Sequence, residues 1–495
     1  MVIEKNPLLQ RAKDMEEMLP YWDMTDTIVK GSKAIKAARE TYLPKFPDEQ
    51  TGDYNFRLQM AKFTNIYRDV LEGLSSKPFE EEITVIKGTE DIPSFVTDFV
   101  EDVDGFGSNI TTFASLTFFN GINSAIDWIF VDHPSAEGTL NMSVSEARKK
   151  NIKPFWTHVL GRNVYEVKTK MVGSKKEIYY FRLFEPSSDG VKANHIRVFE
   201  LVNDVVTWTL YEEVKDAKKT EDQVKEISSG VLSVPVIPFV PFTTGRKDGN
   251  TFAFAPPMLD AADLQITLYQ DESGLQHIKA MAGYPMLAAN GMKPAMSADN
   301  KTPKKVSIGP MRVLYGIPDG NGGHGEWKFI EPNANSMEFL KKDIAATKQD
   351  LRELGRQPLT ALSAQLTTVT TSIAAGKAKS AVTAWALGLK DSLQNALIIT
   401  AMYVGSEYKT EVNIYTGFDN VTDDGSDLDA LNAARDRGDL SQQTYWQEYK
   451  RRKVLSPEFN AEDEERRLFE EIPVEEYEDE TLTQLEPDGD GATIG

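Results

Sequence analysis

The chain has 495 residues, a length that predicts roughly two to four domains. Its hydrophobic content of 40% excludes wholesale disorder, and the absence of cysteine excludes disulfides, thiol nucleophiles and cysteine metal sites. The net charge of −21 argues against a protein that grips nucleic acid over much of its surface, because phosphate binding depends on Lys and Arg.

The negative charge is concentrated at the end of the chain. From Ser456 onward there are 15 acidic and 2 basic residues, which contribute −13, so the remaining body is only mildly acidic. No apolar run approaches the ~20 residues of a membrane span, and the charged N-terminus is unlike a signal peptide. We therefore expect a soluble, unsecreted protein.

Residues 1–80 are predicted to be mostly helical. One helix is expected to end before Pro44, and a second is expected to run continuously from about Asp53 to a stop at Gly73 and Pro78.

Residues 81–255 are predicted to mix helix and sheet. One or two helices lead into a short buried strand at 127–131, which Asp132, His133 and Pro134 close. Apolar and polar residues then alternate in four segments rich in Val, Ile, Tyr and Phe: NVYEVKTKMVG, EIYYFRLFEP, HIRVFELVNDVVTWTLYEEV and SVPVIPFVPF. This pattern favours an antiparallel sheet built from all four.

Two strong helices with a Pro- and Gly-rich insert between them are predicted at the centre of the chain. The first, 256–283, starts at a Pro-Pro pair and has apolar residues spaced by three, four and seven: Ala261, Leu264, Leu268, Leu275, Ile278 and Ala282. The second, 336–356, has an apolar stripe of Met337, Leu340, Ile344, Leu351 and Leu354. The insert, 284–335, is predicted to contain short strands and turns.

The second helix separates its charges by sign. At ~100° per residue, one edge of the apolar stripe carries Lys341, Lys348 and Arg352, and the other carries Asp343 and Asp350. Such edges suit a head-to-tail ring of identical copies, in which the basic edge of one subunit faces the acidic edge of the next. The alternative is an ordinary surface helix whose charges are solvated or paired within the helix, as Glu338 with Lys342.

An uncharged, Thr-rich stretch follows at 357–371. A third, Ala-rich helix is predicted from 372, then a short strand, TEVNIYTGF. A helical pair, 428–437 and 441–453, is expected to join at Gly438, and the acidic tail is expected to end in disorder.

The sequence contains no convincing catalytic or cofactor motif. Gly320, Gly322 and Gly325 match a GxGxxG string, but a strand-like segment follows instead of a helix, so we interpret it as a hairpin loop. Gly376-Lys377 lacks the earlier glycine of a P-loop, and the acidic run 419–429 fails as a calcium loop because Leu431 stands at its twelfth position. We predict a protein that is not an enzyme and needs no cofactor or metal.

Several stretches together resemble the portal proteins of tailed double-stranded DNA phages, in a family often catalogued only as a domain of unknown function. The matching stretches, in order, are YLPKF with Tyr54, Arg57, Asn65 and Arg68; IFVDHP; PPMLDAADLQITLYQDESGLQH with GYPMLAANG; SIGP with a WKFIEP strand; RELGRQPL; GDLSQQTYW; and KVLSPEFNAEDEE. No single motif is specific, whereas their order and spacing over nearly the whole chain are.

This resemblance implies an α+β portal-like subunit. It assigns a helical and β wing (1–80 and 81–255), a two-helix stem (256–283 and 336–356), a small β-containing clip (284–335), a tunnel loop (357–371), a wing helix with its return strand (372–427), crown helices (428–472) and an acidic tail (473–495).

The resemblance also implies function and partners. It implies a ring of about twelve subunits at one capsid vertex, through which DNA is packaged, retained and ejected. The implied partners are the terminase large subunit, head-completion or adaptor proteins, the major capsid and scaffolding proteins, and the double-stranded DNA in the channel, with no membrane. The protein would lie in the virion, and in the host cytoplasm during assembly.

Three groups of residues are candidates for these roles. The tunnel-loop candidates are Arg356, Gln357, Gln365, Thr367, Thr368 and Thr370. The channel or inter-subunit candidates are Lys341, Lys348, Arg352, Asp343 and Asp350, and we favour subunit pairing because the two edges are opposite in sign. The clip docking candidates are Lys301, Lys304, Lys305, Asn321 and His324. The alternative function is another packaging, scaffold or adaptor component of the phage head.

Overall fold

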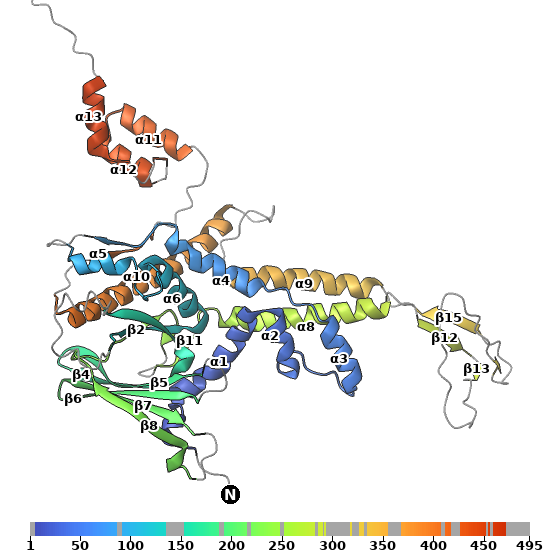
Figure 1. The fold of residues 1–495 in the computed structure, drawn as a ribbon. Coiled ribbons are helices and arrows are strands. Elements are labelled where there is room, and N and C mark those ends of the chain that lie inside the picture. Colours follow the sequence, from blue (N-terminus) through green and yellow to red (C-terminus); the bar gives the residue numbers. More distant parts are fainter. Residues whose placement is uncertain are drawn as a thin grey trace, which may run out of the picture. The chain divides into compact units, whose positions relative to one another are not determined.

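The computed structural model divides the chain into two units, residues 1–418 and 419–495. It describes residues 5–86, 92–134, 153–187, 193–214, 219–247, 252–282, 286–290, 292–293, 317–318, 326–330, 334–354, 368–406, 411–416, 426–451, 454–455 and 459–471. Helices and strands are mixed, as the α+β prediction requires (Figure 1). The assignment of individual segments to wing, stem, clip and crown stays a prediction.

Helices dominate the N-terminal region, as predicted. They are α1 (Lys13–Lys30), α2 (Ser32–Ala37), α3 (Thr51–Met60) and α4 (Ile66–Ser76). Gly31 separates α1 from α2 with a φ of 84°, a conformation that favours glycine. The prediction of one continuous helix from Asp53 was wrong, because residues 61–65 interrupt it.

Side chains from a distant helix explain the interruption between α3 and α4. The backbone N–H groups of Ile66 and Tyr67 donate to Oε1 of Gln265 at 2.9 and 3.0 Å, and Nε2 of Gln265 donates to the carbonyl of Thr64 at 2.9 Å. Asn65 accepts from the N–H of Arg68 at 3.0 Å. The first turn of α4 is thereby capped, and no local pattern reveals the contribution of Gln265.

The first unit contains an antiparallel sheet of three strands and another of five. The strand predicted at 127–131 is the central strand β2 (Ile126–Asp132), which lies between β3 (Phe155–Leu160) and β9 (Phe239–Thr243). It is almost wholly buried, and α6 (Ile110–Ser124) and α10 (Thr368–Val404) both pack against it. The preceding helix α5 (Ser94–Val100) completes the predicted helical segment.

The second sheet corrects the predicted pairing. Its five strands are β4 (Val164–Val172), β5 (Lys175–Glu185), β6 (His195–Val202), β7 (Val205–Glu213) and β8 (Val224–Val231). The strand of SVPVIPFVPF is β9, which belongs to the other sheet, and β8 was not predicted. Phe239 of β9 stacks on Phe130 and Phe181 with ring centroids 4.3 and 3.8 Å apart, which joins the two sheets. Alternation predicts a strand but not its partner.

The helix pair and its β insert are confirmed. Helix α8 (Leu259–Ala282) and helix α9 (Ala334–Leu354) run side by side and lead to the insert (Figure 1). In the insert, β12 (Met286–Asn290) pairs with β15 (Glu326–Ile330), and β13 (Met292–Lys293) pairs with β14 (Ile317–Pro318). Both pairs are antiparallel.

The glycine-rich string 320–325 lies outside the described residues. The strands before and after it, β14 and β15, pair with β13 and β12 and not with each other, so the predicted hairpin was wrong. The next described element is strand β15 and not a helix, which removes the context that a dinucleotide fingerprint needs.

Helix α10 begins four residues earlier than predicted. Thr368 and Thr370, which were assigned to the tunnel loop, therefore lie in its first turn. The short strand after it is β16 (Glu411–Asn413), which pairs with β1 (Thr84–Ile86).

The second unit contains helices α11 (Ser426–Asp436), α12 (Gln442–Arg451) and α13 (Ala461–Glu471). The first two and their junction at Gly438, with a φ of 78°, were predicted. Hydroxyl groups of Tyr445 and Tyr449 in α12 both donate to the side chain of Asn432 in α11. The acidic segment forms a third helix that charge alone did not indicate.

Replacing Gln265 tests the interruption between α3 and α4. Gln265→Leu keeps most of the volume of this buried side chain but leaves the N–H groups of Ile66 and Tyr67 without their acceptor. We expect the free energy of unfolding to fall by about 2–3 kcal/mol. Gln349→Leu, on the exposed surface of α9, is the matched control. Equal stability of the two variants in denaturant titrations contradicts the role of Gln265.

Candidate functional site

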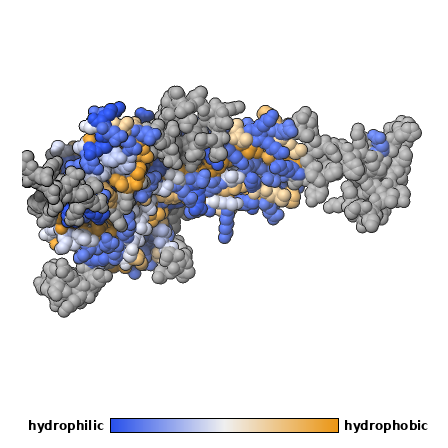
Figure 2. Space-filling view, turned by 90° about the horizontal axis from the view of Figure 1, so that it is seen from above, coloured by the Kyte–Doolittle hydropathy of each residue, from blue (hydrophilic) through white to orange (hydrophobic). Residues whose placement is uncertain are grey.

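The buried faces of α8 and α9 follow the predicted stripes. Ala261, Leu268 and Leu275 of α8 are buried, as are Ile344 and Leu351 of α9. Leu264 and Leu340 are partly buried against the same core. Hydrophilic and hydrophobic surfaces alternate along the helices that lead to the insert (Figure 2).

Glu272 is a charged residue within the apolar stripe of α8. Its side chain is 3% exposed and lies opposite Lys348 of α9, whose Nζ is 2.8 Å from Oε1. The backbone N–H of Thr64 donates to Oε2 at 3.1 Å, and the Thr64 hydroxyl donates to Oε1 at 2.9 Å. Nζ of Lys62 is 3.6 Å from Oε1. Glu272 therefore joins α8, α9 and the segment before α4.

Charge and hydrogen bonding decide the ionisation of Glu272. Burial alone raises the pKa of this carboxyl, but the hydrogen bonds from Lys348 and Thr64 and the nearby ammonium charges outweigh it and hold the pKa below its ordinary value. The group is thus a carboxylate at neutral pH, and its bonds are charge-assisted.

A cavity of about 230 Å³ surrounds this carboxylate. We call it the basic pocket; its lining residues are Lys62, Glu272, Leu275, Gln276, Lys279, Lys341, Ile344, Ala345 and Lys348. Four ammonium groups thus share a site with one carboxylate, which leaves a net charge of three positive units. Lys279 and Lys341 form no ion pair with a carboxylate of the described residues. The basic pocket can accept an anionic group.

The opposite side of the helix pair has acidic side chains that form no ion pair in the part of the chain that the structure describes. Burial raises the pKa of the Asp271 carboxyl, and the negative charge of Asp343 on α9 raises it further. Asp343 and Asp350 are exposed, and neither pairs with a cation in the described part of the chain. Phe339 lies along the same edge of α9 with 70% of its surface exposed. We call Phe339, Asp343 and Asp350, with Asp271 of α8, the acidic edge.

The structure places the predicted charges of α9 on two edges. Lys341 and Arg352 are exposed on one, and Asp343 and Asp350 on the other. Lys348 is half-buried and pairs with Glu272 of its own chain, so one predicted inter-subunit charge has an internal partner. The Glu338–Lys342 pair is not formed, although both side chains are described.

The remaining candidate residues cannot be placed in the fold. Arg356, Gln357, Gln365 and Thr367 of the tunnel loop lie outside the described residues, as do the clip candidates Lys301, Lys304, Lys305, Asn321 and His324. Their roles stay predictions.

Glu272, Gln265, Lys62 and Thr64 were not predicted. Polar residues at Gln265 and Glu272 repeat with Leu268 and Leu275 at spacings of three and four, so they stand inside the apolar stripe. An acid at such a position signals a buried partner. Glu272 has two such partners, Lys348 and Thr64, which lie 76 and 208 residues away along the chain, so the sequence does not reveal them.

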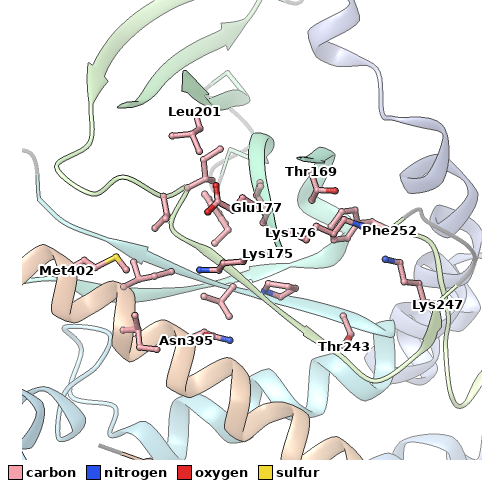
Figure 3. Close-up of a pocket in the computed structure, with 18 of the residues that line it drawn as sticks. Thr169, Lys175, Lys176, Glu177, Leu201, Thr243, Lys247, Phe252, Asn395 and Met402 are labelled. Atoms are coloured by element: carbon pink, nitrogen blue, oxygen red, sulfur yellow. The ribbon is translucent and has the colours of Figure 1, made fainter. Parts of the chain in front are cut away.

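A second cavity, of about 490 Å³, lies between α10 and the two sheets (Figure 3). Its walls are mainly apolar, and they include Phe252 and Met402. Lys176 and Lys247 also line it; burial first, and then the charge of Lys176, lower the pKa of Lys247. Nothing in the sequence indicated this cavity, because its walls combine α10 with strands of both sheets, and the placement of β9 in a separate sheet was not predicted.

Residues that carry the portal resemblance have structural contacts. Arg57, 2% exposed, donates to Glu49 at 2.8 and 2.7 Å and to the carbonyl of Pro44 at 2.7 Å, which ties YLPKF to α3. His133 of IFVDHP stacks on Tyr403 of α10 with centroids 5.4 Å apart. These motifs therefore hold the fold together.

Two further findings apply to the described residues. Among them, no helix is both long enough and apolar enough to cross a membrane. Nor do three His, Asp or Glu side chains of the described ranges come together as a metal site would require.

Comparisons with known proteins give one family match. A family described as a domain of unknown function, DUF4055, matches residues 257–404, which contain α8, the insert, α9 and α10. No curated protein matches the chain.

Solved structures of gene transfer agent particles are similar in part. A chain of the virion of a native particle is 10% identical, with a TM-score of 0.41, over 82% of this chain and 96% of that one. A chain of the neck of an empty particle, with C6 symmetry, is 12% identical, with a TM-score of 0.41, over 82% and 95%. A chain of the neck of a native particle, with C12 symmetry, is 12% identical, with a TM-score of 0.37, over 76% and 87%. Likenesses this weak do not assign a function.

Glu272→Gln tests the buried carboxylate. The variant removes the charge that Lys348 and Lys62 share, and we expect the free energy of unfolding at neutral pH to fall by about 1–3 kcal/mol. Because the folded pKa of Glu272 is lowered, its stabilisation is present above the unfolded value near 4.5 and is lost as pH falls through the folded pKa. Stability of the variant should therefore depend less on pH in that acidic window.

The matched control is Glu353→Gln, at an exposed position of α9. Urea titrations of both variants across the acidic range give the comparison. If Glu272→Gln and Glu353→Gln have the same stability at every pH, Glu272 does not hold the helices together.

Proposed function

We propose that this chain is a portal subunit, a component of a ring that forms the DNA channel at one vertex of a tailed-phage head. The observation that carries the proposal is the arrangement of residues 257–404: two long paired helices, an antiparallel β insert at their end, and a 37-residue helix that returns to the core. This is the order of stem, clip and wing helix that the sequence resemblance implies. The match to a family without assigned function covers the same elements.

In this proposal α8 and α9 are the stem, and the insert is the clip to which the terminase large subunit and later the head-completion proteins bind. The N-terminal helices and the two sheets are the wing. Helices α11 to α13 are the crown, and residues near 357–367 are the tunnel loop. The major capsid and scaffolding proteins are the partners of the wing.

The charge distribution suits a channel through which DNA slides. Each phosphate that pairs with Lys or Arg releases counterions and deepens a salt-dependent energy well, so a continuous basic lining would hold DNA in place. The helix pair has eight acidic and five basic residues, and Lys348 is neutralised by Glu272. We propose a structural role in the channel and no enzymatic one.

The second candidate is a scaffold or adaptor component of the phage head or neck that acts as a monomer. The exposed Phe339, and the charges on both sides of the helix pair that have no ion-pair partner among the described residues, favour the ring, because a monomeric adaptor has no need of two complementary edges.

Native mass spectrometry of the full chain tests the proposal. We expect a closed oligomer of about twelve copies, with a central hole in negatively stained images. A folded protein with the mass of one subunit at every concentration contradicts the portal proposal and leaves the adaptor.

A further inference from the structure

The two sides of the α8–α9 pair have charges of opposite sign that form no ion pair within the described residues. In the basic pocket, Glu272 already accepts hydrogen bonds from Lys348 and Thr64, so it leaves Lys279 and Lys341 without a described carboxylate. On the acidic edge, Asp271 and Asp343 lie near enough for their charges to repel. The basic pocket thus has ammonium groups without carboxylate partners among the described residues, and the acidic edge has carboxylates without ammonium partners among them.

The charges also match in height along α9. Lys341 and Asp343 are two residues apart, which is about 3 Å along a helix axis, and so are Arg352 and Asp350. A ring with cyclic symmetry has no rise from one subunit to the next, so helices that run along its axis meet their neighbours at equal heights. Lys341 of one copy then faces Asp343 of the next, and Arg352 faces Asp350.

Apolar groups accompany the charges on both sides. Leu275, Ile344 and Ala345 line the basic pocket together with its lysines. Phe339 is exposed on the acidic edge, close in height to Lys341. An exposed aromatic beside an acidic group suits a pocket lined by both apolar and basic side chains.

We infer that the basic pocket is the inter-subunit socket of the ring and that its occupant is the acidic edge of a second copy of this chain. Asp343 enters between Lys279 and Lys341, and Phe339 packs on the stems of these lysines. Lys348 stays with Glu272 and shapes the pocket. This inference rests on the proposed ring, and it replaces the α9-only pairing expected from sequence with a site built from both helices.

Charge reversal on each side tests this inference. Asp343→Lys with Asp350→Lys makes both sides of the pair basic, and Lys279→Glu with Lys341→Glu makes both sides acidic. Each double variant alone should need at least about tenfold more protein to assemble, because like charges then meet at every interface. Lys342→Glu, at an exposed position off both edges, is the control and should assemble like the unmodified chain.

An equimolar mixture of the two double variants gives the decisive result. Every contact between unlike variants is complementary, so the mixture should form rings in which the variants alternate and whose subunit number is even. Native mass spectrometry reads both properties directly. If each double variant forms rings alone as readily as the Lys342→Glu control, or the mixture fails to form rings while both variants fold, the socket is wrong.

The outcomes separate this inference from the proposed function. A monomeric unmodified chain overturns the ring itself. If the unmodified chain forms rings and each double variant also forms rings alone, only the socket is overturned. If the Lys279→Glu, Lys341→Glu variant forms rings alone and instead loses salt-dependent binding to double-stranded DNA, the lysines face DNA phosphates and the socket is also wrong.

Discussion

The carboxylate of Glu272 is the interaction on which the helix pair depends. It is nearly inaccessible to water, and two ammonium groups and two donors of Thr64 surround it. A buried charge is costly unless it is fully paired, so α8, α9 and the segment before α4 must lie together for this group to be tolerated. Two turns away on α8, the side chain of Gln265 binds backbone groups of Thr64, Ile66 and Tyr67 and so holds the same segment in place. Side chains of α8 thereby determine both the interruption between α3 and α4 and the position of α9.

This internal pairing also decides which charges remain for a partner. Because Lys348 and Glu272 satisfy each other, the excess positive charge of the pocket lies on Lys62, Lys279 and Lys341. Asp343 and Asp350 lie on the other side of α9, with Asp271 on α8. A molecule with opposite charges on opposite sides favours association with copies of itself, in the head-to-tail sense that generates rings.

The sequence predicted elements better than partners. Periodicity located α8 and α9 to within a few residues, because their apolar stripes are long and regular, and alternation located most strands of the two sheets. These patterns failed where a contact between distant residues determines the structure. The break at 61–65 depends on Gln265, and β9 joins β2 because Phe239 packs between the sheets. At the site, the sequence showed the two charged edges of α9 but not Glu272 or Lys62. The pocket exists only when three segments far apart in the chain meet.

Cross-linking is the most direct test of the account, because the chain has no cysteine of its own. Lys341→Cys and Asp343→Cys, prepared as separate chains and mixed, can be treated with a short bismaleimide that links two thiols. The account predicts linked dimers in the mixture and far fewer in either variant alone, because these two positions lie on opposite edges of one helix and meet only between subunits. Rings that assemble without any enrichment of the mixed cross-link would contradict it.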